Sequence, residues 1–160
     1  MTAVRSLIAI ATGVLLAITA VSPADAVDDG RVDVAPEVAQ MLEEVPGGVL
    51  IDGHHAVWPA LHMELVVPTG SPRSFSASSV GPCPSGGVCL FAGYSLGGTM
   101  LAFSTCGIHS VPSSFSARSL AHARSSGYTQ ARNGTTVLAT AYVGGWANIY
   151  GTTTNLRCVL

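Results

Sequence analysis

From Cys83 to the C-terminus, the chain consists of short apolar runs separated by glycine, serine and threonine. Only the segment from Ala117 to Arg124 has apolar spacing that would suit a helix of more than two turns. A strand needs just four to eight residues between turn residues, whereas an amphipathic helix repeats its apolar positions over a longer window. We therefore expect this part of the chain to be all-β.

Charge divides the chain into two parts. All nine acidic residues lie at or before Glu64, whereas the segment from Cys83 onward contains arginines but no aspartate or glutamate. These arginines are few and are not interleaved with an aromatic stripe, so the pattern does not indicate a nucleic-acid partner. The opposite charges raise the hypothesis that the acidic segment docks on the basic one, as a propeptide or a lid would.

Residues 1–26 have the order of a secretory signal peptide. Arg5 precedes an apolar run from Leu7 to Val21, and the small-x-small sequence Ala24-Asp25-Ala26 follows. The apolar run is too short to span a bilayer comfortably. We expect cleavage after Ala26 and a secreted, extracellular product without stable membrane association.

The four cysteines, Cys83, Cys89, Cys106 and Cys158, all lie in the part that would be exported. An even number of cysteines in an oxidising compartment predicts two disulfides, for which three pairings are possible. Turn residues between Cys83 and Cys89 favour that pair, which leaves Cys106 with Cys158. A zinc site is disfavoured because the spacings are not paired Cys-x-x-Cys units, and no cofactor is expected.

Residues 27–68 are expected to form an acidic leader. Pro36 suits the first turn of a short helix, which Pro46-Gly47-Gly48 ends. Three short apolar runs then predict a small β-meander. These runs are Val49 to Ile51, Ala56 to Trp58 and Leu61 to Val67. Residues 69–82 are rich in serine, proline and glycine and are expected to be a linker to the domain of residues 83–160.

Three histidines of the leader raise the question of a metal site. His54, His55 and His62 lie close in sequence to Asp52 and Glu64, so a hairpin could bring two imidazoles and a carboxylate together. There is no His-Glu-x-x-His motif, and adjacent strand residues point to opposite faces. An exposed polar turn is the favoured interpretation, and no metal is expected.

The segment Gly93-Tyr94-Ser95-Leu96-Gly97 matches the G-x-S-x-G pattern of esterases. A nucleophilic serine of that type needs a helix after it and a triad acid downstream. Here the run from Thr99 to Phe103 resembles a strand, and no acidic residue follows Ser95. We expect no enzyme, and interpret Gly97 and Gly98 as hairpin positions at positive φ.

Two pairs of segments suggest an internal repeat. Gly97 to Phe103 and Gly144 to Tyr150 both begin with two glycines and end with an aromatic residue, and Gly144 and Gly145 are taken as a second turn. Further along, the segment from Ala117 to Leu120 is echoed by that from Leu156 to Val159. We expect two β units of about forty residues that pack as a pair.

Together these segments resemble a known family. The sequence Cys83-Pro-Ser-Gly-Gly-Val-Cys89, the Tyr94-Ser-Leu-Gly-Gly98 turn, the run from Ser114 to Leu120 and the Tyr142-Val-Gly-Gly145 turn are similar to secreted actinobacterial metalloproteinase inhibitors with a βγ-crystallin-like fold. The resemblance covers about residues 81–160. It implies two Greek-key motifs packed as a β-sandwich and, for a subset of members, non-catalytic inhibition of metalloproteinases.

Many crystallin-type motifs bind calcium near their last strand. The matching stretches here, Ser113 to Ser119 and Thr153 to Cys158, contain no carboxylate. Calcium sites usually include carboxylates among several oxygen ligands. No calcium is expected.

If the chain is an inhibitor, a rigid loop should enter the cleft of a secreted peptidase in extended form. The preferred loop is Cys106, Gly107, Ile108, His109, Ser110 and Val111, with Ser125 to Gly134 as the second choice. We expect a monomer whose partner is a secreted peptidase, most suitably a metalloproteinase. The alternative is a non-inhibitory crystallin-like structural or envelope-associated binding protein, and a hydrolase is a distant third.

Overall fold

The computed structural model describes residues 33–70 and 79–160, so the predicted signal peptide and most of the predicted linker lie outside the described residues. Within these ranges the chain forms eleven strands in two antiparallel sheets, one α-helix and one short 3-10 helix. The all-β prediction is confirmed. No helix in the described part is long and apolar enough to cross a membrane.

The helix α1 spans Pro36–Glu44, as the proline and the apolar spacing predict. Val38 and Met41 are buried, because positions three apart lie on the same helix face. After the helix, the carbonyl of Val45 accepts a hydrogen bond from the Trp58 indole at 2.8 Å. This bond fixes the end of the helix against the following strands.

The predicted meander is present as three strands. They are β1 (Val49–Asp52), β2 (His55–Trp58) and β3 (Met63–Val66), with the 3-10 helix Pro59–Leu61 between the last two. The strand β3 also pairs with β5 (Met100–Phe103), from Met63 opposite Phe103 to Val66 opposite Met100. The leader therefore supplies three strands of a sheet that continues into the C-terminal part.

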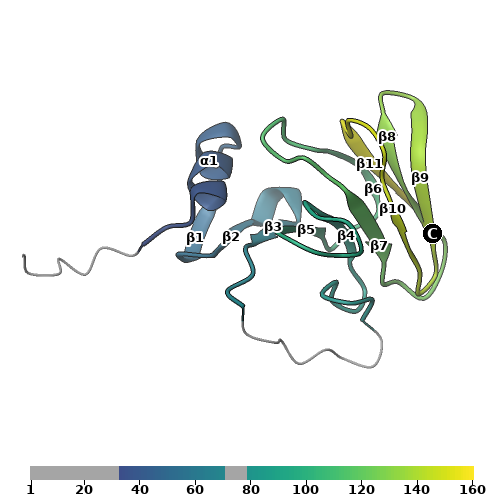
Figure 1. The fold of residues 1–160 in the computed structure, drawn as a ribbon, viewed down its shortest axis with the longest axis horizontal. Helices are drawn as coiled ribbons and strands as arrows, with labels where there is room; N and C mark the ends of the chain where they lie inside the picture. The colour runs from purple at the N-terminus through teal and green to yellow at the C-terminus, as the bar shows by residue number, and fades with distance from the viewer. Residues whose placement is uncertain (1–32, 71–78) are drawn as a thin grey trace, which may run out of the picture. The chain divides into compact units, whose positions relative to one another are not determined.

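Two groups of four strands follow the linker. They are β4 (Val88–Phe91), β5 (Met100–Phe103), β6 (Gly107–Ser110), β7 (Ser119–His122), β8 (Tyr128–Asn133), β9 (Thr136–Tyr142), β10 (Trp146–Asn148) and β11 (Asn155–Val159). One sheet has the order β1-β2-β3-β5-β4-β7-β10 and the other β6-β11-β8-β9 (Figure 1). In each group the fourth strand pairs with the first, while the third strand joins the other sheet.

Two details of the sequence interpretation need correction. The segment from Ala117 to Arg124 contains the strand β7 and no helix, because its apolar residues are covered on both faces of a sheet. The echo of Ala117 to Leu120 in Leu156 to Val159 does fall on equivalent strands, β7 and β11. The two Gly-Gly turns are not equivalent, since one joins β4 to β5 and the other joins β9 to β10.

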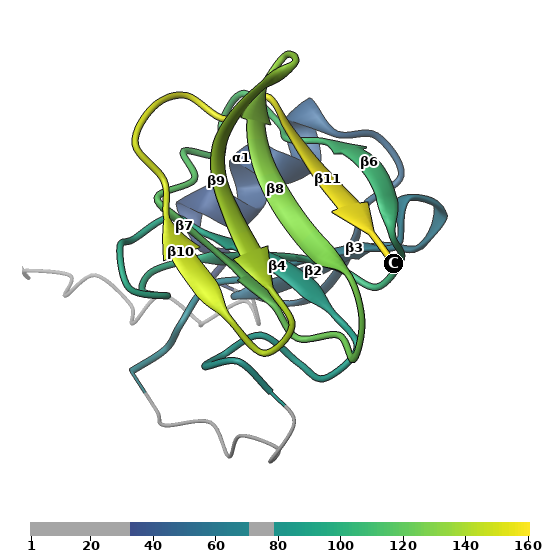
Figure 2. The ribbon, with the colours of Figure 1, turned by 90° about the vertical axis from the view of Figure 1, so that its right-hand side faces the viewer.

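The main core lies between the two sheets and extends under the helix. Leu90, Leu101 and Leu120 of the large sheet are fully buried with Leu156 of the small one, and Met41 of α1 belongs to the same cluster. Accordingly, α1 and the four-stranded sheet lie on the same side of the large sheet (Figures 1 and 2). The leader thus contributes to the core of the C-terminal part.

Both favoured disulfides are present, joining Cys83 to Cys89 and Cys106 to Cys158. The first closes a short loop over the outer face of the large sheet, where Cys83 and Cys89 belong to a second apolar cluster. The second joins the start of β6 to β11, where Gly107 pairs with Cys158. Each disulfide therefore fixes a segment that strand pairing or side-chain packing also holds in place.

The acidic leader contacts the C-terminal part through a glutamate. The carboxylate of Glu44 accepts hydrogen bonds from Ser113 N–H at 2.6 Å, Ser113 Oγ at 2.8 Å and Ser114 N–H at 3.0 Å. Hydrogen bonds from Ser114 and Ser113 lower the pKa of Glu44 from 4.5 to about 2. No ion pair joins an arginine to a carboxylate in residues 33–70 and 79–160, so the hypothesis of docking through opposite charges does not describe this contact.

We predict that Glu44→Gln lowers stability near neutral pH by about 1 kcal/mol, a value much smaller than the pKa shift implies because the carboxylate is exposed to water. A folded-state pKa below the unfolded one contributes stability above pH 4.5, which is lost as the pH falls through about 2. Thermal unfolding of both proteins from pH 6 to pH 2 should therefore show a difference that shrinks in that window. The neighbouring Glu43→Gln is the control, and an equal effect of both substitutions would contradict the assignment.

Candidate functional site

The segment chosen from the sequence as an inhibitory loop is a strand. Gly107–Ser110 form β6, which pairs with β11 from Gly107 opposite Cys158 to Ser110 opposite Asn155. The expected extended conformation and the disulfide at Cys106 are both present. The expectation of a loop is wrong, because the strand partner lies about fifty residues away in sequence and no local pattern reveals it.

The side chains of this segment differ in exposure. Ile108 is 70% exposed, whereas Val111 is buried in the main core. The ring of His109 stacks on Phe103 with centroids 4.4 Å apart, and its Nε2 lies 2.9 Å from the carbonyl of Thr105. Of the six predicted residues, Ile108 alone presents a large apolar side chain to solvent, and Val111 is unavailable to a partner.

One backbone edge of β6 is open, since β6 is an edge strand of the four-stranded sheet and pairs with β11 on its other side. The N–H of Val111 donates to the carbonyl of Thr154 at 3.0 Å. In an antiparallel pair, residues that exchange hydrogen bonds alternate with residues whose N–H and C=O face away. The backbone groups of Ile108 and Ser110 therefore face the open edge.

The second candidate, Ser125 to Gly134, does not offer a free extended segment. Most of it is the strand β8, which lies between β11 and β9. Both edges of this strand are hydrogen-bonded within the sheet. The backbone groups of the strand in this candidate are therefore already paired within the sheet.

The predicted turn glycines play two different roles. Gly98 has φ +74° and Gly144 has φ +66°, the left-handed region that favours glycine. Gly97 and Gly145 are not at positive φ, contrary to the expectation for Gly97. A Cβ on Gly97 would lie 3.2 Å from the carbonyl of Tyr94. In the turn between β4 and β5, Gly98 thus adopts the left-handed conformation. Gly97, which lacks a Cβ, leaves room for that turn to close.

Ser95 lies in this turn, at φ +53°, and its N–H donates to Asn148 Oδ1 at 2.9 Å. The next element along the chain is the strand β5. The strand–serine–helix geometry of a nucleophile elbow is therefore not formed around Ser95.

Among the leader histidines, His55 Nε2 lies 3.5 Å from Glu64 Oε2. Within the described residues, no three histidine, cysteine, aspartate or glutamate side chains are grouped as a metal site. The hairpin thus brings one of the three histidines to a carboxylate.

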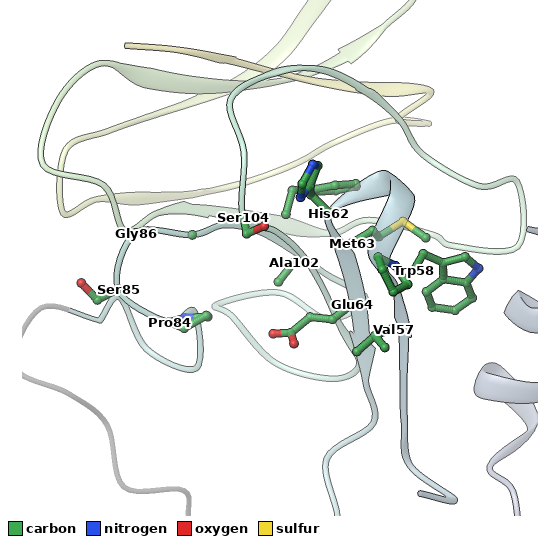
Figure 3. Close-up of a pocket in the computed structure, with 13 residues that line it drawn as sticks. Val57, Trp58, His62, Met63, Glu64, Pro84, Ser85, Gly86, Ala102 and Ser104 are labelled. Carbon is green, nitrogen blue, oxygen red and sulfur yellow. The ribbon is translucent and has the colours of Figure 1, made fainter. Parts of the chain in front are cut away.

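A cleft of about 630 Å³ lies on the outer face of the large sheet, between the leader and the Cys83–Cys89 loop (Figure 3). Its floor follows one row of the sheet register, in which Val57 is opposite Glu64 and Glu64 is opposite Ala102. Figure 3 shows the Glu64 carboxylate pointing toward Pro84 of the facing loop. Glu64 is the only carboxylate among the lining residues, and this same carboxylate lies 3.5 Å from His55 Nε2.

Comparison of the chain with protein-family models, with curated proteins and with solved structures gave no match. The family resemblance of the sequence therefore remains a prediction.

We predict that the two apolar residues of this segment contribute unequally to stability. Ile108→Ala should change the free energy of unfolding by less than about 0.5 kcal/mol, because its side chain is exposed. Val111→Ala should destabilise by about 1 to 2 kcal/mol, because it removes buried apolar volume. Urea unfolding of the oxidised protein measures both values, and a large loss for Ile108→Ala would show that this side chain is structural.

Proposed function

We propose that this chain is a secreted proteinaceous peptidase inhibitor, with metalloproteinases as its first targets. The observation that carries the proposal is Ile108, an exposed apolar side chain at the middle of an extended edge strand. The disulfide from Cys106 to Cys158 fixes the start of that strand to its neighbour. A segment already held in the binding conformation loses little conformational entropy on association.

Binding to the peptidase would need no catalytic group from this chain. The outward N–H and C=O groups of Ile108 and Ser110 can form backbone hydrogen bonds with an extended segment lining the peptidase cleft. Ile108 would fill an apolar specificity pocket, as central anchors of tight interfaces do. His109 would support the strand from the opposite face through its stack on Phe103.

We further propose that residues 83–160 form a βγ-crystallin-like sandwich of two Greek keys. In a Greek key the fourth strand returns beside the first, and here β7 pairs with β4 while β11 pairs with β8. The third strands, β6 and β10, join the opposite sheets. This connectivity supports the fold that the sequence resemblance implies.

Secretion is part of the proposal and rests on two observations. Both cysteine pairs form disulfides, which persist in oxidising compartments. The first 26 residues have the composition of a signal peptide.

Inhibition is tested by titrating the purified oxidised protein against a thermolysin-type metalloproteinase and a subtilisin-type serine peptidase. We expect a stoichiometric loss of metalloproteinase activity, and Ile108→Ala should weaken inhibition by about thirtyfold or more, the effect of losing a central anchor. The matched control is Ile51→Ala, which removes an exposed isoleucine from the edge strand β1 and should leave inhibition unchanged.

If both peptidases keep full activity at excess protein while the protein itself resists cleavage, the inhibitor proposal is wrong. A non-inhibitory binding or structural protein would then be the better description. Equal weakening by the Ile51 and Ile108 substitutions would place the contact surface away from β6.

A further inference from the structure

The outer face of the large sheet carries exposed aromatic side chains on and beside its edge strand β10. Trp146 pairs with Ala121 and Asn148 pairs with Ser119 across the strand β7. Ala121 belongs to the apolar cluster on this outer face, so Trp146 and Asn148 project from the same face. Tyr150 lies two residues beyond the end of β10, and its ring lies beside that of Tyr94, which the turn between β4 and β5 holds over β10.

These rings are open to solvent. Trp146 is 48% exposed and Tyr150 is 73% exposed. The ring of Tyr94, itself 48% exposed, lies 5.8 Å from that of Tyr150 at an angle of 33°. We call Tyr94, Trp146, Asn148 and Tyr150, together with Arg118, the aromatic row.

The turn that carries Tyr94 is fixed over β10. Ser95 N–H donates to Asn148 Oδ1 at 2.9 Å, and Leu96 N–H donates to Ser119 Oγ at 3.0 Å. The same Ser119 hydroxyl donates to the carbonyl of Gly93 at 2.7 Å. Two strands and the turn between β4 and β5 therefore hold the exposed rings in place, and little ordering is required on binding.

The row contains one cation that no carboxylate of the structure neutralises. The guanidinium of Arg118 lies 6.0 Å from the centre of the Tyr94 ring. The sequence has no acidic residue after Glu64, and no ion pair to Arg118 exists within the described ranges. An anionic group on a ligand would complement the charge of this surface.

We propose that the aromatic row binds an anionic polysaccharide that carries carboxylate groups. The apolar C–H faces of sugar rings would stack on Trp146, Tyr150 and Tyr94, whose π faces are electron-rich. Arg118 would bind a sugar carboxylate through charge-assisted hydrogen bonds, and the Asn148 amide N–H groups would donate to hydroxyls. This surface is separate from β6, so the inference does not depend on peptidase inhibition.

Two other macromolecules fit the row less well. Protein interfaces are enriched in Tyr, Trp and Arg but depleted of serine, and here Ser95 lies in the turn between the rings. Duplex DNA carries one charge per about 1.7 Å and is bound by many cations, whereas this row offers a single arginine. A sparsely charged chain of sugar rings fits a row of exposed aromatic rings with a single cation best.

The experiment is affinity electrophoresis of the oxidised protein in gels that contain polygalacturonate or the same polymer with its carboxylates methyl-esterified. We expect retardation by polygalacturonate and at least about tenfold weaker binding to the neutral ester, because the Arg118 contact is lost. Trp146→Ala, Tyr150→Ala and Arg118→Gln should each weaken binding to polygalacturonate at least about tenfold.

Two controls are matched to these variants. Tyr142→Ala removes an exposed ring from β9, outside the row, and Arg157→Gln removes a positive charge from β11. Neither should change retardation, and neither should Ile108→Ala. Since all the substituted side chains of the row are exposed or half-exposed, thermal unfolding should stay close to wild type and confirm that the variants fold.

Several results would overturn the proposal. These are the absence of retardation by either polymer, equal retardation by the charged and the esterified polymer, and unchanged binding by the Trp146 and Tyr150 variants. A concentration-dependent self-association in sedimentation that Tyr150→Ala abolishes, without polymer binding, would make the row a protein interface instead.

Discussion

The pairing of β3 with β5 is the contact on which the rest of the structure depends. It joins the acidic leader to the C-terminal strands through a continuous sheet, so Trp58 and the buried face of α1 reach the common core. The cleft beside Glu64 exists because this pairing places the leader next to the Cys83–Cys89 loop. Removal of the leader would uncover the edge of β5 together with apolar side chains, which is a costly way to activate a protein. A leader bound in this manner behaves as part of the domain.

The two proposed surfaces offer different chemical groups to a partner, although both arise from the same arrangement of strands. The strand β6 offers open backbone groups and one aliphatic side chain, whereas β10 offers rings and an arginine and is fixed by the neighbouring turn. Both are third strands that have crossed into the opposite sheet, and both consequently lie at sheet edges. Edge positions leave side chains and backbone accessible while the core remains closed. Binding at one edge does not require the other, because different sheets carry them.

Local sequence patterns were sufficient to predict part of this structure. The helix from Pro36, the three leader strands and the Cys83–Cys89 loop depend on residues close in sequence, and each could be predicted. The contacts of Glu44 with Ser113 and the grouping of Tyr94 with Tyr150 join residues more than fifty positions apart, so no periodicity reveals them. The segment around Ile108 was chosen for its cysteine and its apolar residues, but its strand partner, and hence the burial of Val111, depends on β11. Strand pairing across long separations is a property of the whole chain.

Each group of four strands places its third strand in the sheet of the other group, and this exchange affects how the chain folds. Neither group of four strands can complete its own sheet, since β6 needs β11 and β10 needs β7. Contacts of such long sequence separation require large loops to close before they contribute stability, and proteins of this kind fold slowly. The chain should therefore acquire its tertiary structure late and in a single cooperative step, after the last strand has been synthesised. The proposed export of the chain, in an unfolded form, is compatible with that order of events.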